Sequence, residues 1–252
     1  MNQTLDEIAR TLFTSWFVNF DPVRAKMAGR QPDGMDAATA ALFPDRLVDS
    51  ALGPIPEGWE VRSLDEIGSF LNGLALQKHP PRGDDTDLPV IKIAQLRDNN
   101  TFSASTANSD VPSKYIVENG DFLFSWSGSL LATVWSGGRG ALNQHLFKVT
   151  SHYPTWFIYH WVHEHIDHFR RIAADKATTM GHINRHHLSA AMCAVPTNRT
   201  IHELGNRSIG ELIALALTNS LESRTLAELR TMLLPELLSG RLLAPGSDEV
   251  ES

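Results

Sequence analysis

The sequence predicts a mixed α/β domain, of the α+β kind, between a short N-terminal helix and a long C-terminal coiled-coil helix. Three observations predict this fold class. Apolar and polar residues alternate with the period of strands in the middle of the chain. Leucines repeat with the period of a coiled coil between residues 200 and 234, and a shorter amphipathic pattern opens the chain at residues 3 to 17.

The N-terminal pattern predicts a short amphipathic helix. Leu5, Ile8, Leu12 and Trp16 follow a 3-4-4 spacing, which gathers them on one helical face. We expect the helix to end before Asp21, because a proline follows that residue. The same pattern recurs near the other end of the chain, where residues 226 to 238 match residues 5 to 17 at a constant offset of 221. If the repeat is structural, the chain starts and ends with the same unit.

Residues 21 to 58 are rich in proline and glycine and predict an irregular connector. One short helix is expected near Met35 to Leu42, started by Asp33 or Asp36. The segment is longer than most loops, so we expect it to pack on the rest of the protein.

The middle of the chain, about Pro54 to Pro196, predicts strands and one helix. Asn119–Gly120 and Gly137–Gly138 are typical of turns. Four segments have the period of regular structure: strands at 88–96, 120–126 and 141–149, and a helix at 156–172.

The C-terminal helix has a coiled-coil seam with a polar break. Its apolar seam positions are Leu212, Leu215, Leu226, Leu229 and Leu233, and the polar ones are Asn219 and Glu222. A buried Asn fixes the register of paired helices, so we expect an antiparallel partner helix. The other interpretation is an ordinary core helix of a bundle.

The ends of this long helix also have sequence signals. Thr200 with Glu203, and Ser208 with Glu211, match the capping box. Pro235 is expected to stop or kink the helix, and Ser239–Gly240 to close it.

Composition excludes several classes of protein. The 252 residues are 42% hydrophobic, which is enough for a real core, and the net charge of −7 argues against a purely electrostatic nucleic-acid binder. The single Cys193 excludes a disulfide framework. Because neither a signal peptide nor a long apolar stretch is found, we expect a cytoplasmic protein.

Two long runs of sequence resemble one family. The run LDEIARTLFTSWFVNFDPVRAKMAGRQPDGMDAATAALFPD, followed by LGPIPEGWEV, is similar to the central conserved region of specificity subunits of type I restriction-modification systems. The closing run NSLESRTLAELRTMLLPELLSGRL resembles their C-terminal conserved helix. The middle of the chain matches only in outline, as the resemblance implies for a target recognition domain.

The resemblance implies a division of the chain. Such subunits usually have two recognition domains and two conserved helices, so this chain resembles the second half of a subunit or a half-sized one. The implied parts are the end of a conserved helix (1–20), a conserved connector (21–53), a target recognition domain (54–199), a conserved spacer helix (200–240) and a flexible tail (241–252).

The resemblance also implies the activity and the partners. It implies a non-catalytic subunit that binds double-stranded DNA sequence-specifically and directs adenine methylation and restriction by other chains. The expected partners are methyltransferase (M) subunits, restriction (R) subunits, and a second recognition half or an identical copy paired through the long helix. S-adenosylmethionine, and ATP with Mg, are expected in the partner subunits and no cofactor in this chain.

Four polar loops of the middle domain are candidates for DNA contact. Arg and Lys can bind guanine O6 and N7, Asn and Gln can bind adenine N6 and N7, and hydroxyl groups can hold phosphates. By resemblance, loops in matching positions contact the target. The candidates are Gln77, Lys78, His79 and Arg82; Ser125, Trp126 and Ser127; Arg139, Asn143, Gln144 and His145; and Lys176, Thr178, Thr179, His182, Asn184 and Arg185.

Histidines offer an alternative function, a metal-dependent hydrolase. His160, Glu164 and His168 have an i, i+4, i+8 spacing, and His182 and His186 are also four residues apart, a spacing that can chelate Zn²⁺. No third protein ligand is identified for either pair, so we expect no metal. Nucleotide-binding, methyltransferase and nuclease motifs are also missing, which favours a chain without catalysis of its own.

Overall fold

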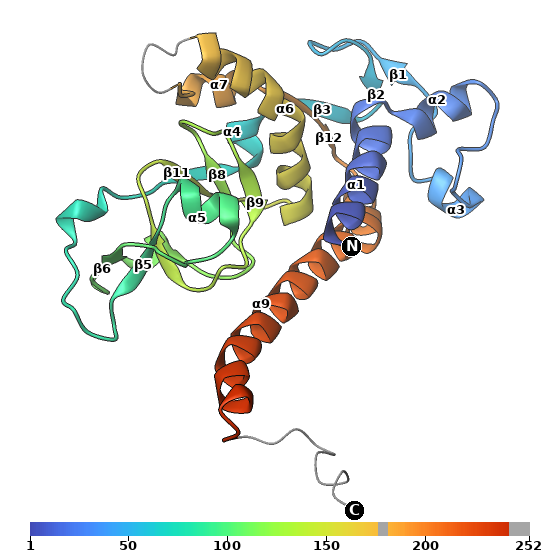
Figure 1. Ribbon diagram of the computed structural model, residues 1–252. Helices are drawn as coiled ribbons and strands as arrows, with labels where there is room; N and C mark the ends of the chain where they lie inside the picture. Colours follow the sequence, from blue (N-terminus) through green and yellow to red (C-terminus); the bar gives the residue numbers. More distant parts are fainter. Residues whose placement is uncertain (176–180, 242–252) are drawn as a thin grey trace, which may run out of the picture.

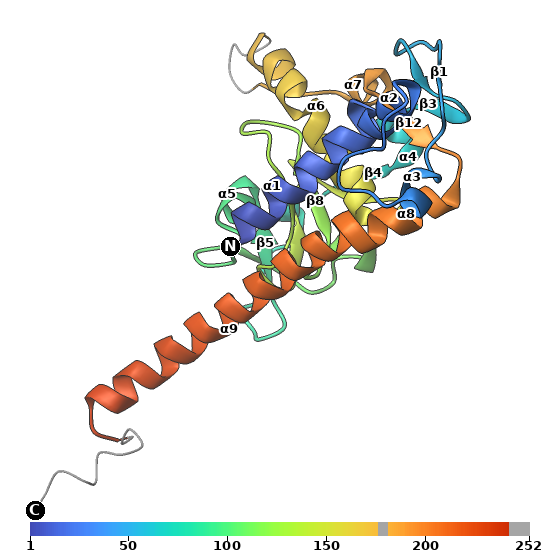
Figure 2. The same cartoon turned by 90° about the vertical axis from the view of Figure 1, so that its right-hand side faces the viewer.

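The computed structural model describes residues 1–175 and 181–241 and has the expected mixed architecture (Figure 1). A globular body of small sheets and helices lies beside a long helix that projects from it (Figure 2). The α-helices are α1 (Asn2–Phe13), α2 (Asp21–Met27), α3 (Ala37–Ala40), α4 (Leu64–Ile67), α5 (Ile93–Asp98), α6 (Thr155–Asp175), α7 (Arg185–Ala190), α8 (Arg199–Gly205) and α9 (Glu211–Leu238).

Short strands form the sheets of the globular body. One sheet has the order β4-β11-β8-β9, a second β6-β5-β10-β7, and two-stranded ribbons are formed by β12-β3 and β1-β2. Among these pairings β5 and β10 are parallel and the others antiparallel. The strands are β1 (Leu47–Val48), β2 (Ile55–Pro56), β3 (Trp59–Ser63), β4 (Ser69–Asn72), β5 (Leu88–Ile91), β6 (Thr106–Ala107), β7 (Ile116–Val117), β8 (Phe122–Ser125), β9 (Ala132–Val134), β10 (Gly140–Leu142), β11 (Leu146–Thr150) and β12 (Met192–Pro196).

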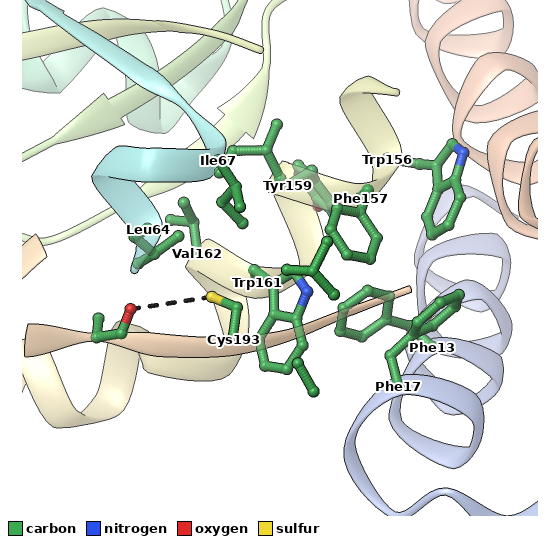
Figure 3. Close-up of a cluster of buried hydrophobic side chains, with 14 of the residues drawn as sticks. Phe13, Phe17, Leu64, Ile67, Trp156, Phe157, Tyr159, Trp161, Val162 and Cys193 are labelled. Carbon is green, nitrogen blue, oxygen red and sulfur yellow. Dashed lines mark hydrogen bonds between the residues drawn. The ribbon is translucent and has the colours of Figure 1, made fainter. Parts of the chain in front are cut away.

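Helix α6 is the centre of the main core. Phe124 of β8 and Phe169 of α6 pack with ring centroids 6.1 Å apart, which joins the helix to the first sheet. On its other side α6 meets α1, where Phe13 lies 6.1 Å from Phe157 and Phe17 lies 5.6 Å from Trp156 (Figure 3). The N-terminal helix therefore belongs to the same core as the globular domain.

Helix α1 also packs antiparallel on the start of α9. The Asn2 amide donates to the Ala216 carbonyl at 3.0 Å and to the Ser220 hydroxyl at 2.9 Å, while Asn219 donates to Asn2 Oδ1 at 3.0 Å. The first turns of α9 thus have an antiparallel neighbour within the chain, the short helix α1. Asn219, predicted to fix the register of a partner helix, makes this bond to α1 of its own chain.

The two copies of the sequence repeat pack differently. Phe13 of α1 and Phe17, in the turn Thr14–Val18 that follows it, are buried, whereas their equivalents Leu234 and Leu238 are exposed on α9. Ala9 of α1 is buried in the main core, and its equivalent on α9 is Arg230, whose side chain is too large and too polar for that position. The repeat therefore does not place the two ends of the chain in equal environments.

Each of the two helical ends contains one π-helical turn. One spans Thr14–Val18 after α1, and the other spans Asn206–Gly210 between α8 and α9. Trp156 packs beside the second, since a Cβ built on Gly205 would lie 2.3 Å from its ring. The long helix is therefore continuous from Arg199 to Leu238 but not uniformly α-helical.

Several helix predictions are confirmed. Residues 3 to 17 are helical, α6 contains the predicted 156–172 segment, and the long helix closes at Ser239 with Gly240 in the left-handed region at φ +70°. Asp36 is the N-cap of α3 and accepts from the Thr39 amide at 2.7 Å, although α3 is shorter than the predicted Met35–Leu42.

Other helix predictions are wrong. Pro235 does not stop the helix, since it lies inside α9, which continues to Leu238. The N-cap at 198 is Asn198, which accepts from the Thr200 amide at 3.0 Å, so Thr200 is not a cap. Ser208 lies within the π-helical turn, where no helix begins.

Two predicted strands are also broken. Residues 88–96 end as a strand at Ile91 and continue as α5, whose first turn is capped by Gln95 accepting from the Lys92 amide at 3.3 Å. Residues 141–149 form two strands, β10 and β11, separated by Asn143–His145. In both segments the alternation of apolar and polar residues continues past the end of the first strand, because residues beyond that point are buried as well. The alternation alone therefore does not show where the strand ends.

No helix in the described ranges is long and apolar enough to cross a membrane. Of the predicted tail at 241–252, residues 242–252 lie outside the described residues.

Candidate nucleic-acid interface

Three polar segments meet at one end of the β4-β11-β8-β9 sheet. They are the turn after β8, the turn between β10 and β11, and the segment that leads into α7. Backbone bonds join them: the Ile183 amide donates to the Trp126 carbonyl at 2.9 Å, and the Trp126 amide to the His145 carbonyl at 3.3 Å. Ser127 and His182 form an isolated antiparallel bridge.

The indole of Trp126 is the centre of this meeting point. Its Nε1 donates to Asn72 Oδ1 at 2.8 Å and to the Gln144 carbonyl at 3.1 Å. Its ring lies 5.7 Å from the ring of His145 and 6.3 Å from that of His182. We call the set Asn72, Trp126, Ser127, Gln144, His145 and His182 the Trp126 cluster.

Side-chain bonds continue the cluster outward. The Ser127 hydroxyl and His145 Nδ1 are 3.0 Å apart, and Gln144 Nε2 and His145 Nε2 are 3.3 Å apart. Gln144 and His145 are half-buried and His182 is exposed, so the cluster is partly packed in the domain and presents polar groups at its outer edge. Such an edge offers amide and imidazole groups of the kind that bind base edges.

Three predicted contact residues lie beneath this edge instead. Ser125, Ser127 and Asn143 are buried. The Ser125 hydroxyl donates to the Ser129 carbonyl and accepts from the Leu131 amide at 2.8 Å, and Asn143 Oδ1 accepts from the His145 amide at 3.3 Å. Their hydrogen-bonding groups therefore shape the turns.

The segment that leads into α7 contributes Asn184 and Arg185, both exposed. Asn184 is the N-cap of α7, and its backbone amide donates to His187 Nδ1 at 2.9 Å. The Arg185 guanidinium donates to the Phe70 carbonyl at 3.0 Å and lies 5.8 Å over the Phe147 ring. The Phe147 ring under Arg185 lies 6.1 Å from the ring of Trp126, so one aromatic side chain separates Arg185 from the Trp126 cluster. The predicted residues Lys176, Thr178 and Thr179 lie outside the described residues.

The first predicted loop connects to the cluster at its beginning only. The Gln144 amide donates to the Leu74 carbonyl at 2.9 Å, after which Leu76–Lys78 form a 3-10 turn with Gln77 and Lys78 exposed.

Its later part is attached to the other four-stranded sheet. The Asn108 amide donates to the His79 carbonyl at 3.1 Å, and Arg82 forms an ion pair with Asp110. His79 and Arg82 thus lie beside β6 rather than at the cluster.

Arg139 is separated from the other candidates. It precedes β10, whereas Asn143 to His145 follow that strand, so they lie at opposite ends of it. Its guanidinium forms an ion pair with Glu118 at 3.0 Å on the side of the domain that faces α9. Arg139 therefore lies apart from the Trp126 cluster.

Several neighbours of the cluster were missed from sequence. Arg97 donates to the Ser129 hydroxyl at 3.0 Å, and Arg170 donates to the Leu130 carbonyl at 3.0 Å, so two cations hold the turn that follows Ser127. Arg97 was missed because its segment was interpreted as a strand. Asn72 had a usable signal, since it precedes a glycine just before the first loop.

The histidine helix does not form a metal site in the described residues. His160 is buried and stacks on Phe13 at 4.9 Å, and burial lowers its pKa to about 3. Glu164 and His168 are exposed, so His160 does not share a surface with them. In the described ranges no group of three or more His, Cys, Asp or Glu residues could hold a metal. His160 belongs to the buried face of α6, whereas Glu164 and His168 lie on its exposed face.

Comparison with known proteins gives one consistent result. Residues 56–198 match the family described as "Type I restriction modification DNA specificity domain". The HindI specificity subunit of Haemophilus influenzae (strain ATCC 51907 / DSM 11121 / KW20 / Rd), a type I restriction enzyme subunit, is 25% identical over 293 residues, which cover 96% of this chain and 62% of that protein. The corresponding EcoBI specificity subunit of Escherichia coli is 23% identical over 145 residues, 56% of this chain and 30% of that protein.

Among solved structures, the HsdS subunit from Thermoanaerobacter tengcongensis has a TM-score of 0.42 and 16% identity, and the match covers 96% of this chain and 52% of that one. A chain from a structural study of complex assembly in the type I R-M system has a TM-score of 0.43 and 17% identity, covering 93% of this chain and 56% of that one. The chain spans less than two thirds of the length of the curated relatives it matches.

Proposed function

Because the chain belongs to the type I restriction modification DNA specificity family, we propose that it binds double-stranded DNA sequence-specifically through the Trp126 cluster. The observation that carries the proposal is the junction of three polar segments around one indole, braced by bonds of 2.8 to 3.1 Å. Base recognition needs side chains held in fixed positions, and loops attached to one another at a sheet end meet that need.

Individual roles follow from side-chain chemistry. The Gln144 amide is suited to adenine N6 and N7, whereas the Arg185 guanidinium is suited to guanine or to a phosphate. Arg97 and Arg170 flank the turn after Ser127 and bring positive charge to this end of the sheet, in a chain whose net charge is −7. Base contacts give specificity, and phosphate contacts give orientation and salt dependence.

The test compares Gln144→Ala and Arg185→Ala with Arg199→Ala. Arg199 is an exposed cation on α8 and serves as the matched control. Binding to cognate and scrambled duplexes is measured by fluorescence anisotropy at several salt concentrations, after a methylome of the source strain has given the target.

Replacement of a base-reading residue should cost about 1–3 kcal/mol of binding free energy and relax the specificity at one position of the site. Replacement of a phosphate-contacting residue should weaken binding to all sequences alike and lower the salt slope by about one. Cognate affinity that stays at the wild-type value in both cluster variants would show that the DNA interface lies elsewhere.

The proposal includes partner chains. We propose that the chain is not itself catalytic and that it directs adenine methylation and restriction by M and R subunits, in which S-adenosylmethionine and ATP with Mg are bound. The relatives it matches are named as specificity subunits of restriction enzymes, which supports this role. We propose that the chain binds this DNA in the cytoplasm. Methyl transfer to DNA by the purified chain alone would contradict the proposal.

Helix α9 is proposed to pair with a second recognition half or with an identical copy. Leu226, Leu229 and Leu233 are 65%, 42% and 45% exposed, and Leu215 is 48% exposed, whereas Leu212 packs on the chain's own core. An exposed apolar stripe of this kind favours association. The paired helices would then act as a ruler that sets the gap between two DNA half-sites.

A heptad inserted after Leu229 tests the ruler. Seven helical residues keep the seam in phase and add about 10 Å. The gap between half-sites should grow by about three base pairs, at about 3.4 Å per step, when target sites are mapped by methylome sequencing. A gap that stays the same would contradict the ruler.

A further inference from the structure

We propose that Arg224 is a positioning residue that braces the long helix against the recognition domain and sets the angle at which its outer half projects. Arg224 lies in α9, and its Nη1 donates to the Ser136 carbonyl at 3.3 Å. Its Nε donates to Glu228 Oε1 at 2.8 Å, four residues along the same helix. The guanidinium is therefore fixed from both sides, by its own helix and by the loop between β9 and β10.

Gly138 makes room for this contact. Its backbone lies in the left-handed region at φ +94°, and a Cβ built on it would lie 2.6 Å from Nη1 and 2.9 Å from Nη2 of Arg224. The guanidinium thus lies directly against the loop backbone, at a position whose left-handed conformation favours glycine.

The loop that receives Arg224 is itself rigid. Asn99 Oδ1 accepts from the Ser136 amide at 3.0 Å, and its Nδ2 donates to the Ser136 hydroxyl at 2.7 Å. Asn119 Oδ1 accepts from the Gly138 amide at 2.8 Å, and the indole of the buried Trp135 donates to the Gly138 carbonyl at 2.6 Å. A helix tied to this loop is therefore tied to the core of the domain.

Arg224 is also the last such tie along the helix. Before it, α1 holds α9 through Asn2, and Leu217 lies 3.6 Å from a Cβ built on Gly120. Beyond Arg224, in the described part of the chain, no hydrogen bond or ion pair joins α9 to the globular domain. A groove of about 900 Å³ separates them, lined by the 98–102 loop with Phe102 and by residues of α9 that include Arg230 and Met232.

A change at this brace is amplified along the helix. Residues 225 to 238 extend about 21 Å, so a tilt of about 10° at Arg224 moves the helix end by about 4 Å. That displacement is close to one base-pair step of about 3.4 Å. The inference rests on the proposed function for this consequence only, since the brace itself is a property of the chain without DNA.

The experiment measures the distance between spin labels on the domain and on the helix end. Labels are placed at Thr150→Cys and Ser239→Cys, with the buried Cys193 replaced by Ala, and the distance distribution is recorded by pulsed electron paramagnetic resonance on the full chain. Arg224→Ala should broaden the distribution or shift its mean by several ångströms, while the melting temperature stays near that of the parent. Arg224→Lys should restore part of the parent's distance distribution, because the lysine ammonium can still pair with Glu228.

Arg230→Ala is the matched control. It lines the same groove and makes no hydrogen bond or ion pair in the described ranges, so its distribution should equal the parent's. If Arg224→Ala does not fold, Glu228→Ala, which frees the guanidinium, should give a smaller change in the same direction. Parent-like distributions in the Arg224 and Glu228 variants, or an equal change in Arg230→Ala, overturn the brace.

Failure of the brace and failure of the proposed function are distinguishable. A shifted distribution in Arg224→Ala, together with a parent that binds no DNA, supports the brace and refutes the proposed function. With DNA binding intact, Arg224→Ala should leave the affinity for a single half-site unchanged, because Arg224 does not contact the Trp126 cluster.

Discussion

Replacement of His160 by Phe should remove a large part of the acid sensitivity of this protein. His160 is 2% exposed and stacks on Phe13 of α1, and no partner for its Nε2 is found among the described residues. Burial, with the nearby His163 and Arg10, lowers its pKa to about 3. In the unfolded chain the pKa is about 6.5.

The sign follows from proton linkage. Below pH 6.5 the unfolded chain binds a proton at His160 that the folded chain does not, so stability falls as the pH falls from 6.5 towards 3. The stability that the neutral, buried His160 contributes is therefore fully present above pH 6.5. One such proton changes the free energy of unfolding by about 1.4 kcal/mol per pH unit, which gives about 2 kcal/mol between pH 7 and pH 5.

Urea denaturation of the two proteins at pH 7, 6 and 5, followed by circular dichroism, measures the difference. The Phe variant keeps a planar ring against Phe13 and should lose about 2 kcal/mol less than the parent over this range. His168, exposed on the same helix, provides the control, and His168→Phe should keep the parent's pH dependence. Equal losses in the parent and in His160→Phe would refute the reasoning.

Three further predictions concern packing. Gly73→Ala should weaken DNA binding measured by anisotropy while helix content stays the same, because its Cβ would lie 2.2 Å from the carbonyl oxygen of Asn143 and would push two candidate loops apart; unchanged affinity would contradict it. Gly205→Ala should lower the free energy of unfolding in urea by about 1–3 kcal/mol, since its Cβ would lie 2.3 Å from the Trp156 ring. A more stable variant would show that the higher helix propensity of alanine outweighs the contact with Trp156. Leu229→Asp should leave monomer stability within about 0.5 kcal/mol of the parent and reduce association in analytical ultracentrifugation; a parent-like association constant would exclude this face.

Sequence patterns predicted the long elements well, because a helix of many turns repeats its signal. The Leu5–Trp16 spacing predicted α1, and the leucine repeat predicted α9, because apolar residues at helical spacing mark a helix of several turns. The spacing did not predict burial, since Ile8 of α1 is exposed and α9 buries none of its residues. The segments that failed are those where burial continues through a turn. Residues 88 to 96 are apolar on both sides of Ile91, so nothing in their period marks the change from β5 to α5.

The candidate site was predicted in its residue types and only partly in its geometry. Trp126, Gln144 and His145 do come together, although no spacing in the sequence joins residues of separate turns. Arg139 lies elsewhere, because the two ends of β10 point to different sides of the domain. Long-range contacts of this kind depend on sheet order, which local patterns do not encode.

The π-helical turn at Asn206–Gly210 has a consequence for which direction each part of the long helix faces. A π turn accommodates one more residue than an α turn, and one residue corresponds to a rotation of about 100° about the axis. Residues before the turn, such as Ile201, are buried in the core, whereas those after it present Leu215 and then Leu226 to solvent. The turn therefore rotates the residues of α9 by about 100° relative to those of α8 within one continuous helix. In the resulting orientation Arg224 faces Ser136.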